Sequence, residues 1–119
     1  MNIMVHEEAP EAEIVGGRIL SGGIDFSTGQ VTIKYIYQLQ NGAQYRGTFT
    51  GKVTTPGIVR GDWEDRMTAP RGRRNMGPRE AHGTAELAFA LVGGTLLLRG
   101  YWWHPTVTGK KAWLLWLGP

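Results

Sequence analysis

The chain has 119 residues and a formal net charge of +3, from 13 Lys or Arg against 10 Asp or Glu. This length predicts one domain, and 18 glycines with no long amphipathic helical pattern favour an all-β class. Because the chain has no cysteine, a disulfide framework, thiolate chemistry and a zinc–thiolate site are excluded.

No apolar run approaches the ~20 residues that cross a bilayer as a helix. The N-terminal residues are polar and acidic, unlike the basic and then apolar start of a secretory signal peptide. A cytoplasmic protein is therefore expected.

In chain order, a flexible acidic leader is predicted over residues 1–12, followed by a β-barrel domain over 13–119. The first strand is expected at 13–20, with Gly16-Gly17 and Gly22-Gly23 as bends. The turns and apolar patterns then predict strands at 31–40, 44–54, 58–66, 83–92, 95–104 and 110–117. The whole is an antiparallel meander of seven or eight strands.

The strongest strand pattern lies at 31–40, where Val31, Ile33, Tyr35, Tyr37 and Leu39 alternate with polar residues and Ile36. A period of two places alternate side chains on opposite faces of a sheet. Asn41-Gly42 follows, and this dipeptide is typical of a two-residue hairpin turn. The next strand, from Gln44, is predicted to pair back from that turn.

A motif of arginine, glycine, any residue and an aromatic recurs at Arg46–Phe49, Arg60–Trp63 and Arg99–Trp102. Each glycine shares a face with the aromatic two residues later. Glycine weakens a strand unless a bend or a close approach requires it, so these core-facing glycines indicate a strongly coiled sheet. We therefore predict a closed or nearly closed barrel.

These segments resemble the avidin family, whose small meander barrels repeat a hydrophobic residue, any residue, glycine, any residue and an aromatic. The matching stretches are 45–49, 59–63 and 98–102, and Trp113-Leu114-Leu115 resembles a late strand of that family. The resemblance implies an avidin-like or lipocalin-like barrel. The family's ligand-contacting first-strand pattern is absent, so biotin binding is not implied.

Six aromatic residues share the predicted inner face and are candidate ligand-binding residues: Tyr35, Tyr37, Tyr45, Phe49, Trp63 and Phe89. Barrels of this size either fill their interior with side chains or hold one small ligand. Buried tyrosine hydroxyls need hydrogen-bond partners, and inner glycines such as Gly47 are expected to leave volume unfilled. A filled aromatic core is the alternative.

For catalysis the candidates are Asp65, His104 and Tyr37. Asp65 shares the inner face of Trp63 near a strand end, where a carboxylate beside tyrosines can act as a base. An ordinary strand-end carboxylate is the alternative for Asp65, and a structural or solvated histidine is the alternative for His104. His82, His104 and the scattered carboxylates show no metal-ligand spacing, so neither a metal nor a cofactor is expected.

A long Arg-rich loop is predicted at 67–81. Its Arg73 and Arg74 could bind phosphate or carboxylate bidentately and cover the barrel mouth as a lid over an anionic ligand. A solvated loop is the alternative, and nucleic acid ranks below a small anion because no aromatic residue is interleaved there.

The last two strands are apolar on both faces, whereas a water-exposed barrel strand alternates. One outer face is therefore expected to be covered by the N-terminal segment, another subunit or a partner, and a homo-oligomer through residues 95–117 is favoured. Three functions stay open. The first is non-covalent binding of a small ligand, which would be anionic if the Arg-rich loop covers it as a lid. The second is a cofactor-independent cyclase or isomerase for a mostly apolar substrate. The third is an interaction module with a filled core.

Overall fold

The computed structural model describes residues 2–6, 14–39, 42–68, 80–106 and 109–118. These residues form eight strands and no helix. The strands are β1 (Asn2–His6), β2 (Ile14–Asp25), β3 (Gln30–Leu39), β4 (Gln44–Thr55), β5 (Ile58–Met67), β6 (Glu80–Val92), β7 (Thr95–Trp103) and β8 (Lys111–Leu117). The predicted all-β class is confirmed.

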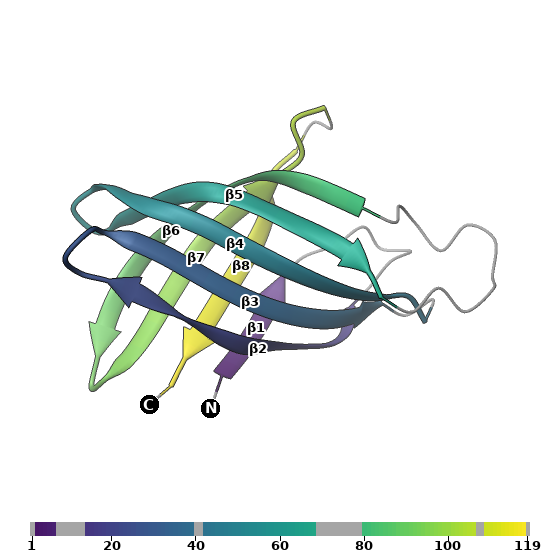
Figure 1. Cartoon of the computed structure of the whole chain (residues 1–119), viewed down its shortest axis with the longest axis horizontal. Coiled ribbons are helices and arrows are strands. Elements are labelled where there is room, and N and C mark those ends of the chain that lie inside the picture. Colours follow the sequence, from purple (N-terminus) through teal and green to yellow (C-terminus); the bar gives the residue numbers. More distant parts are fainter. Residues whose placement is uncertain (1, 7–13, 40–41, 69–79, 107–108, 119) are drawn as a thin grey trace.

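Each strand pairs antiparallel with the next one in the chain, and the pairing closes into a barrel (Figure 1). The continuous part is the seven-strand meander from β2 to β8. Strand β1 closes the ring: it pairs with β8 over Asn2–His6, whereas its register with β2 rests on Ile3 and Arg18. The meander barrel predicted from the turns and alternations is therefore confirmed.

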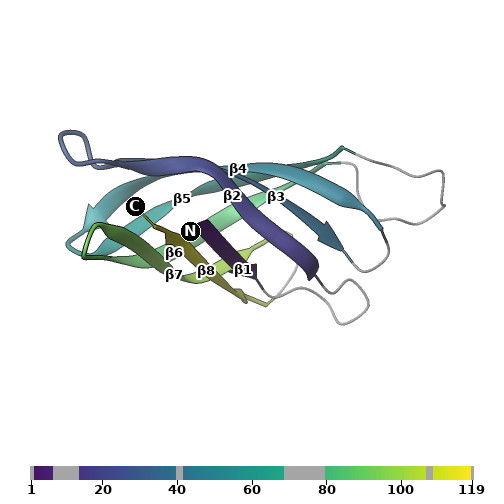
Figure 2. The same cartoon turned by 90° about the horizontal axis from the view of Figure 1, so that it is seen from below.

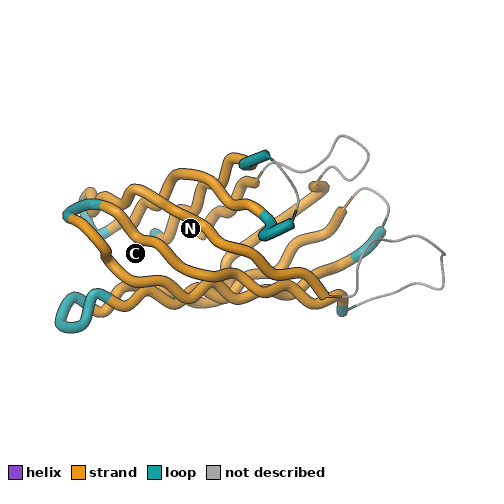
Figure 3. Tube along the Cα trace, turned by 90° about the horizontal axis from the view of Figure 1, so that it is seen from above, coloured by secondary structure: helices purple, strands orange, loops and turns teal. Residues whose placement is uncertain are grey.

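The two ends of the barrel differ. At the turn end, β2–β3, β4–β5 and β6–β7 are joined by short turns at 26–29, 56–57 and 93–94. At the loop end, the connections are 40–43, 68–79 and 104–110. The strands run between these ends along the long axis of the molecule (Figures 2 and 3). Asp65, near the last residue of β5, lies towards the loop end.

Two predictions for the N-terminal region are wrong. Residues 2–6, expected to belong to a flexible leader, form β1, because Met4 is buried against the core and the backbone completes the ladder of β8. Strand β2 continues to Asp25, so Gly22 and Gly23 lie inside it rather than at bends between elements. Residues 7–12 of the predicted leader lie outside the described residues.

The β3–β4 hairpin has a longer loop than predicted. The Leu39 N–H donates to the Ala43 carbonyl at 2.9 Å, so the hairpin loop between Leu39 and Ala43 has three residues, 40–42, instead of the predicted two. Tyr37 then lies opposite Tyr45, whereas a two-residue loop would place Tyr37 opposite Arg46. Because a one-residue shift exchanges the two faces of a strand, burial of the aromatic residues selects the observed register.

The core lies inside the barrel and is built from inward side chains of every strand. The alternation is complete in β3, where Val31, Ile33, Tyr35, Tyr37 and Leu39 are buried. The residues facing them across the interior include Leu98 and Leu115, which are fully buried.

At three core-facing glycines, a neighbouring strand's backbone approaches closely. A Cβ at Gly61, Gly83 or Gly100 would lie 2.1 Å from a carbonyl oxygen of the neighbouring strand. None of these glycines has a positive φ, so the requirement is close backbone approach rather than a left-handed conformation. The coiled sheet predicted from the repeated motif is thus present at Gly61 and Gly100.

We expect Gly61→Ala to destabilise the fold, because its Cβ would collide with the Thr50 carbonyl at 2.1 Å. The expected loss in free energy of unfolding is about 3 kcal/mol, the range of an overpacked core. Gly23→Ala is the matched control: it also lies within a strand, but its Cβ would meet nothing within 4 Å. It should be neutral or slightly stabilising in urea unfolding. Equal losses in both variants would contradict this interpretation.

Candidate functional site

A row of three residues across β3, β4 and β5 forms the centre of the candidate site. Tyr35 pairs with Gly47, and Gly47 pairs with Asp65. Because all three face inward, the Tyr35 side chain passes over the glycine and reaches the carboxylate two strands away. A Cβ at Gly47 would lie 2.3 Å from the Asp65 Oδ1 and 2.4 Å from the Tyr35 ring. The contact between Tyr35 and Asp65 therefore requires glycine at position 47.

Asp65 is a carboxylate buried inside the barrel, with 9% of its surface exposed. The Tyr35 hydroxyl donates to its Oδ1 and the Tyr37 hydroxyl donates to its Oδ2, each at 2.5 Å. Burial of a charge is costly unless it is paired or hydrogen-bonded, and hydrogen bonds to an ionised acceptor are the short, strong ones. The two tyrosines stabilise the carboxylate in this apolar interior.

Aromatic rings surround this cluster. Tyr45 stacks on Tyr37 with 5.3 Å between ring centroids, and Trp113 meets the Tyr35 ring edge-on at 5.6 Å. Trp113 belongs to β8, so it reaches across the interior to rings of β3 and also contacts Phe49 of β4 at 5.7 Å. The carboxylate thus lies in a largely aromatic environment, which strengthens its hydrogen bonds because the local dielectric constant is low.

The indole nitrogen of Trp113 is another polar atom of interest inside the barrel. Its side chain is 4% exposed, and its buried indole Nε1–H has no acceptor among the described residues. A buried tryptophan N–H usually finds a partner, and an unsatisfied donor costs about 1–3 kcal/mol. This atom is a candidate contact for a water molecule or a ligand in the interior.

The space above the inner glycines is occupied, which corrects the expectation that they leave volume unfilled. Asp65 and Tyr35 fill the position beside Gly47, and Phe49 with Val59 fill the position beside Gly51 at 2.7–2.9 Å. At Gly61 and Gly100 the neighbouring backbone itself takes the space. These glycines favour a well-filled interior at their positions.

The other predicted site residues are not brought together with Asp65 by any contact between the described residues. Trp63 is buried and donates its Nε1–H to the Thr84 carbonyl at 3.1 Å. His104, a catalytic candidate from the sequence, meets the Trp63 and Trp102 rings edge-on at 5.1 and 5.8 Å, a packing that favours the structural alternative. Phe89 is half-buried and packs against the core. Arg73 and Arg74 lie outside the described residues.

The sequence analysis missed Trp113 and the role of Gly47 in the site. Trp113 was assigned only to the apolar last strand, although its alternation with Ala112 and Leu114 could have placed it inward. The function of Gly47 depends on the register of three strands, for which the sequence holds no local signal.

The described residues contain no group of three His, Asp or Glu side chains placed to hold a metal ion. Within the same residues, no helix has the length and apolar character needed to cross a membrane. Comparisons with protein-family models, curated proteins and solved structures found no match for this chain. The function is therefore inferred from the geometry of the barrel interior.

We expect Tyr37→Phe and Tyr35→Phe each to lower the free energy of unfolding by about 2 kcal/mol, because each removes a hydrogen bond to a buried carboxylate. Tyr101→Phe is the matched control, since Tyr101 is 55% exposed. Its loss should stay within about 0.5 kcal/mol. Combining Asp65→Ala with either tyrosine variant in a double-mutant cycle should reveal coupling. Additive losses would show that the hydrogen bonds do not stabilise the fold.

Proposed function

We propose that the barrel binds a small molecule non-covalently in its interior towards the loop end, with Asp65 as the polar anchor. The observation that carries the proposal is the buried Asp65 carboxylate between the hydroxyls of Tyr35 and Tyr37. We also propose that the barrel holds its ligand as avidin-like or lipocalin-like barrels do, and that the protein is cytoplasmic.

Burial of the Asp65 carboxylate costs free energy that an apolar side chain would not cost. Replacement of a buried charged group by well-packed apolar side chains is often neutral or stabilising. A barrel that needed only a core could therefore use an apolar residue in place of Asp65, as it does at Leu87 and Leu98. A carboxylate with two hydroxyls in an aromatic interior is the arrangement that small-molecule sites use to fix orientation, which supports a binding role.

The charge of the cluster restricts the ligand. Inside the barrel, a carboxylate favours a molecule that donates a hydrogen bond or carries a positive charge. The Trp113 Nε1–H, buried without an acceptor among the described residues, favours a carbonyl oxygen or a ring nitrogen on the same molecule. An anionic group on the ligand would suit the loop end instead, where Arg73 and Arg74 are predicted to meet it.

A second candidate is an enzyme that rearranges a mostly apolar substrate by positioning it. The observation that favours it is again Asp65, since a buried carboxylate beside hydroxyl groups can accept a proton from a bound substrate. Tyr35 and Tyr37 would then orient the carboxylate. In this version Asp65→Asn abolishes turnover of the substrate but retains its binding, whereas in a binding protein the same change weakens the binding itself.

The test of the binding proposal is native mass spectrometry of the purified protein, followed by the same sample after denaturation. We expect extra mass on the folded protein that is lost on unfolding, and a reduced bound fraction in Asp65→Asn. Asp62→Asn is the matched control, because Asp62 lies on the same strand but faces outward and is exposed.

Equal ligand occupancy in Asp65→Asn and the unchanged protein would contradict the role of Asp65. A protein that carries no small molecule, and gains none when incubated with the small-molecule extract of its expression host, would contradict binding in the barrel. That result would favour the third hypothesis, an interaction module with a filled core.

A further inference from the structure

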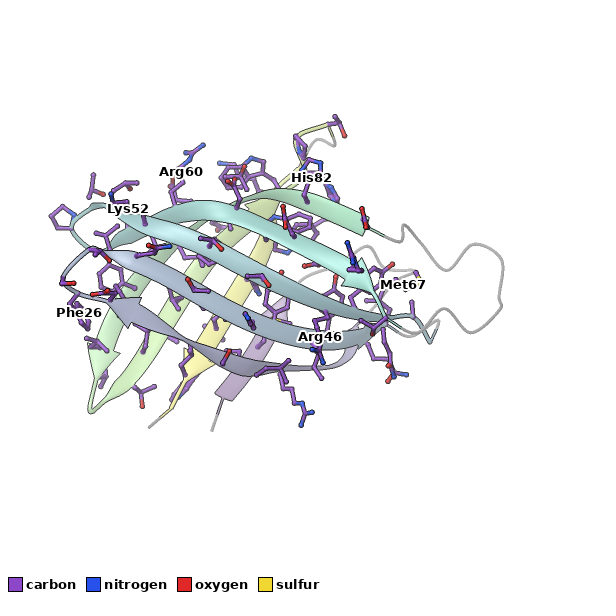
Figure 4. All side chains as sticks on the ribbon, viewed as in Figure 1. Phe26, Arg46, Lys52, Arg60, Met67 and His82 are labelled. Atoms are coloured by element: carbon purple, nitrogen blue, oxygen red, sulfur yellow. The ribbon has the colours of Figure 1, made fainter. Side chains whose placement is uncertain are left out.

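The outer surface of the barrel has two different halves. On β3, β4 and β5 the outward side chains are mostly polar or charged, and Figure 4 shows Arg46, Lys52 and Arg60 projecting from that side. On β6, β7 and β8 most outward positions are apolar. Tyr101 is 55% exposed and Trp116 is 45% exposed, and Leu97 and Leu114 lie half-buried beside them. We call this second half the apolar face.

Two cross-strand rows of the apolar face are graded by side-chain size, whereas the adjacent row Glu86–Tyr101–Ala112 is not. One cross-strand row runs from Ala90 through Leu97 to Trp116, and the next runs from Ala88 through Arg99 to Leu114. Both rows are small on β6 and large on β8. A surface with a small side and a large side can match a second copy of itself, provided that the two copies meet with β6 over β8.

The charges on the apolar face also fit a second copy. Arg99 is exposed and makes no ion pair with the described residues. Glu86, at the edge of the face, pairs with Arg60 at 3.3 Å, and both side chains are about half exposed. One cation and one anion separated on one surface become complementary when that surface meets its own copy.

Segments of the chain outside the described residues are poorly suited to cover this face. Residues 7–13 are mainly glutamate with alanine and proline, and residues 69–79 are rich in arginine, glycine and proline. Neither offers the large apolar side chains that Trp116 and Leu97 require. A contiguous apolar patch with exposed tyrosine and tryptophan is typical of a protein–protein contact.

We propose that this protein forms a two-fold symmetric dimer through the apolar face, with two barrels packed back to back. The two-fold axis runs parallel to β7 beside Leu97, so β8 of one copy lies over β6 of the other. Trp116 then packs on Ala90 of the partner subunit, and Leu97 meets Leu97 of the partner subunit. Sheets packed this way lie about 10 Å apart with strands crossing at about −30°.

In this arrangement Glu86 of the partner subunit lies one strand across and two residues along from Arg99, within reach of an arginine side chain. The dimer leaves the loop ends of both barrels open. The proposal therefore does not depend on ligand binding, and either can be wrong without the other.

The first test is the mass in solution by analytical ultracentrifugation over a range of concentrations. We expect a dimer for the unchanged protein and a monomer for Trp116→Glu, with the dissociation constant raised about a hundredfold, because a charge buried without a partner opposes association. Ile36→Glu is the matched control: Ile36 faces outward on β3 between Arg18 and Arg46, so the variant should remain a dimer.

The second test fixes the geometry and uses the absence of cysteine from the chain. A short thiol-to-thiol crosslinker should join Leu97→Cys to its own copy, because the axis passes beside residue 97. Thr50→Cys, exposed on the outer side of β4, should not crosslink.

A monomer at every concentration would overturn the proposal. If that monomer bound phosphatidylcholine vesicles, the apolar face would be assigned to a lipid surface instead. A dimer unaffected by Trp116→Glu, or one crosslinked through Thr50→Cys and not through Leu97→Cys, would also overturn it.

Discussion

The arrangement of the barrel interior depends on one buried carboxylate. Asp65 is kept inside an aromatic environment by the hydroxyls of Tyr35 and Tyr37 at 2.5 Å. That contact requires the glycine at position 47, because any side chain there would occupy the place of the carboxylate and the tyrosine ring. It also fixes the register of β3, β4 and β5 together, since a slip of one residue would move these groups to the outer face.

The sequence predicted which face of the sheet a side chain occupies better than which residues it contacts. Alternation placed Tyr35, Tyr37 and Asp65 on the inner face, and all three are buried. Their meeting could not be predicted, because it depends on a register that the Asn41-Gly42 signal placed one residue out. Strand β1 was missed because Asn2–His6 is short and becomes a strand only through its ladder with β8. The expected contribution of Arg73 and Arg74 stays a prediction.

Glycine has two roles in this barrel: one shapes the fold, and the other makes the candidate site possible. At Gly61, Gly83 and Gly100 it allows backbones to approach where the sheet coils. At Gly47 it makes room for a polar contact between side chains of different strands. The same motif of arginine, glycine and aromatic therefore serves architecture in its later copies and the candidate site in its first. The outer surface divides in a similar way: charged and polar side chains cover β3–β5, behind the site, and apolar side chains cover much of β6–β8.

The central claim is that the interior near Asp65 holds a small molecule. A high-resolution crystal structure of the protein as purified tests this claim most directly. We predict electron density that belongs to no side chain, with a donor within hydrogen-bond distance of the Asp65 carboxylate and an acceptor at the Trp113 Nε1–H. An interior filled only by side chains, in crystals of the purified protein and in crystals grown with the small-molecule extract of its host, would contradict the claim.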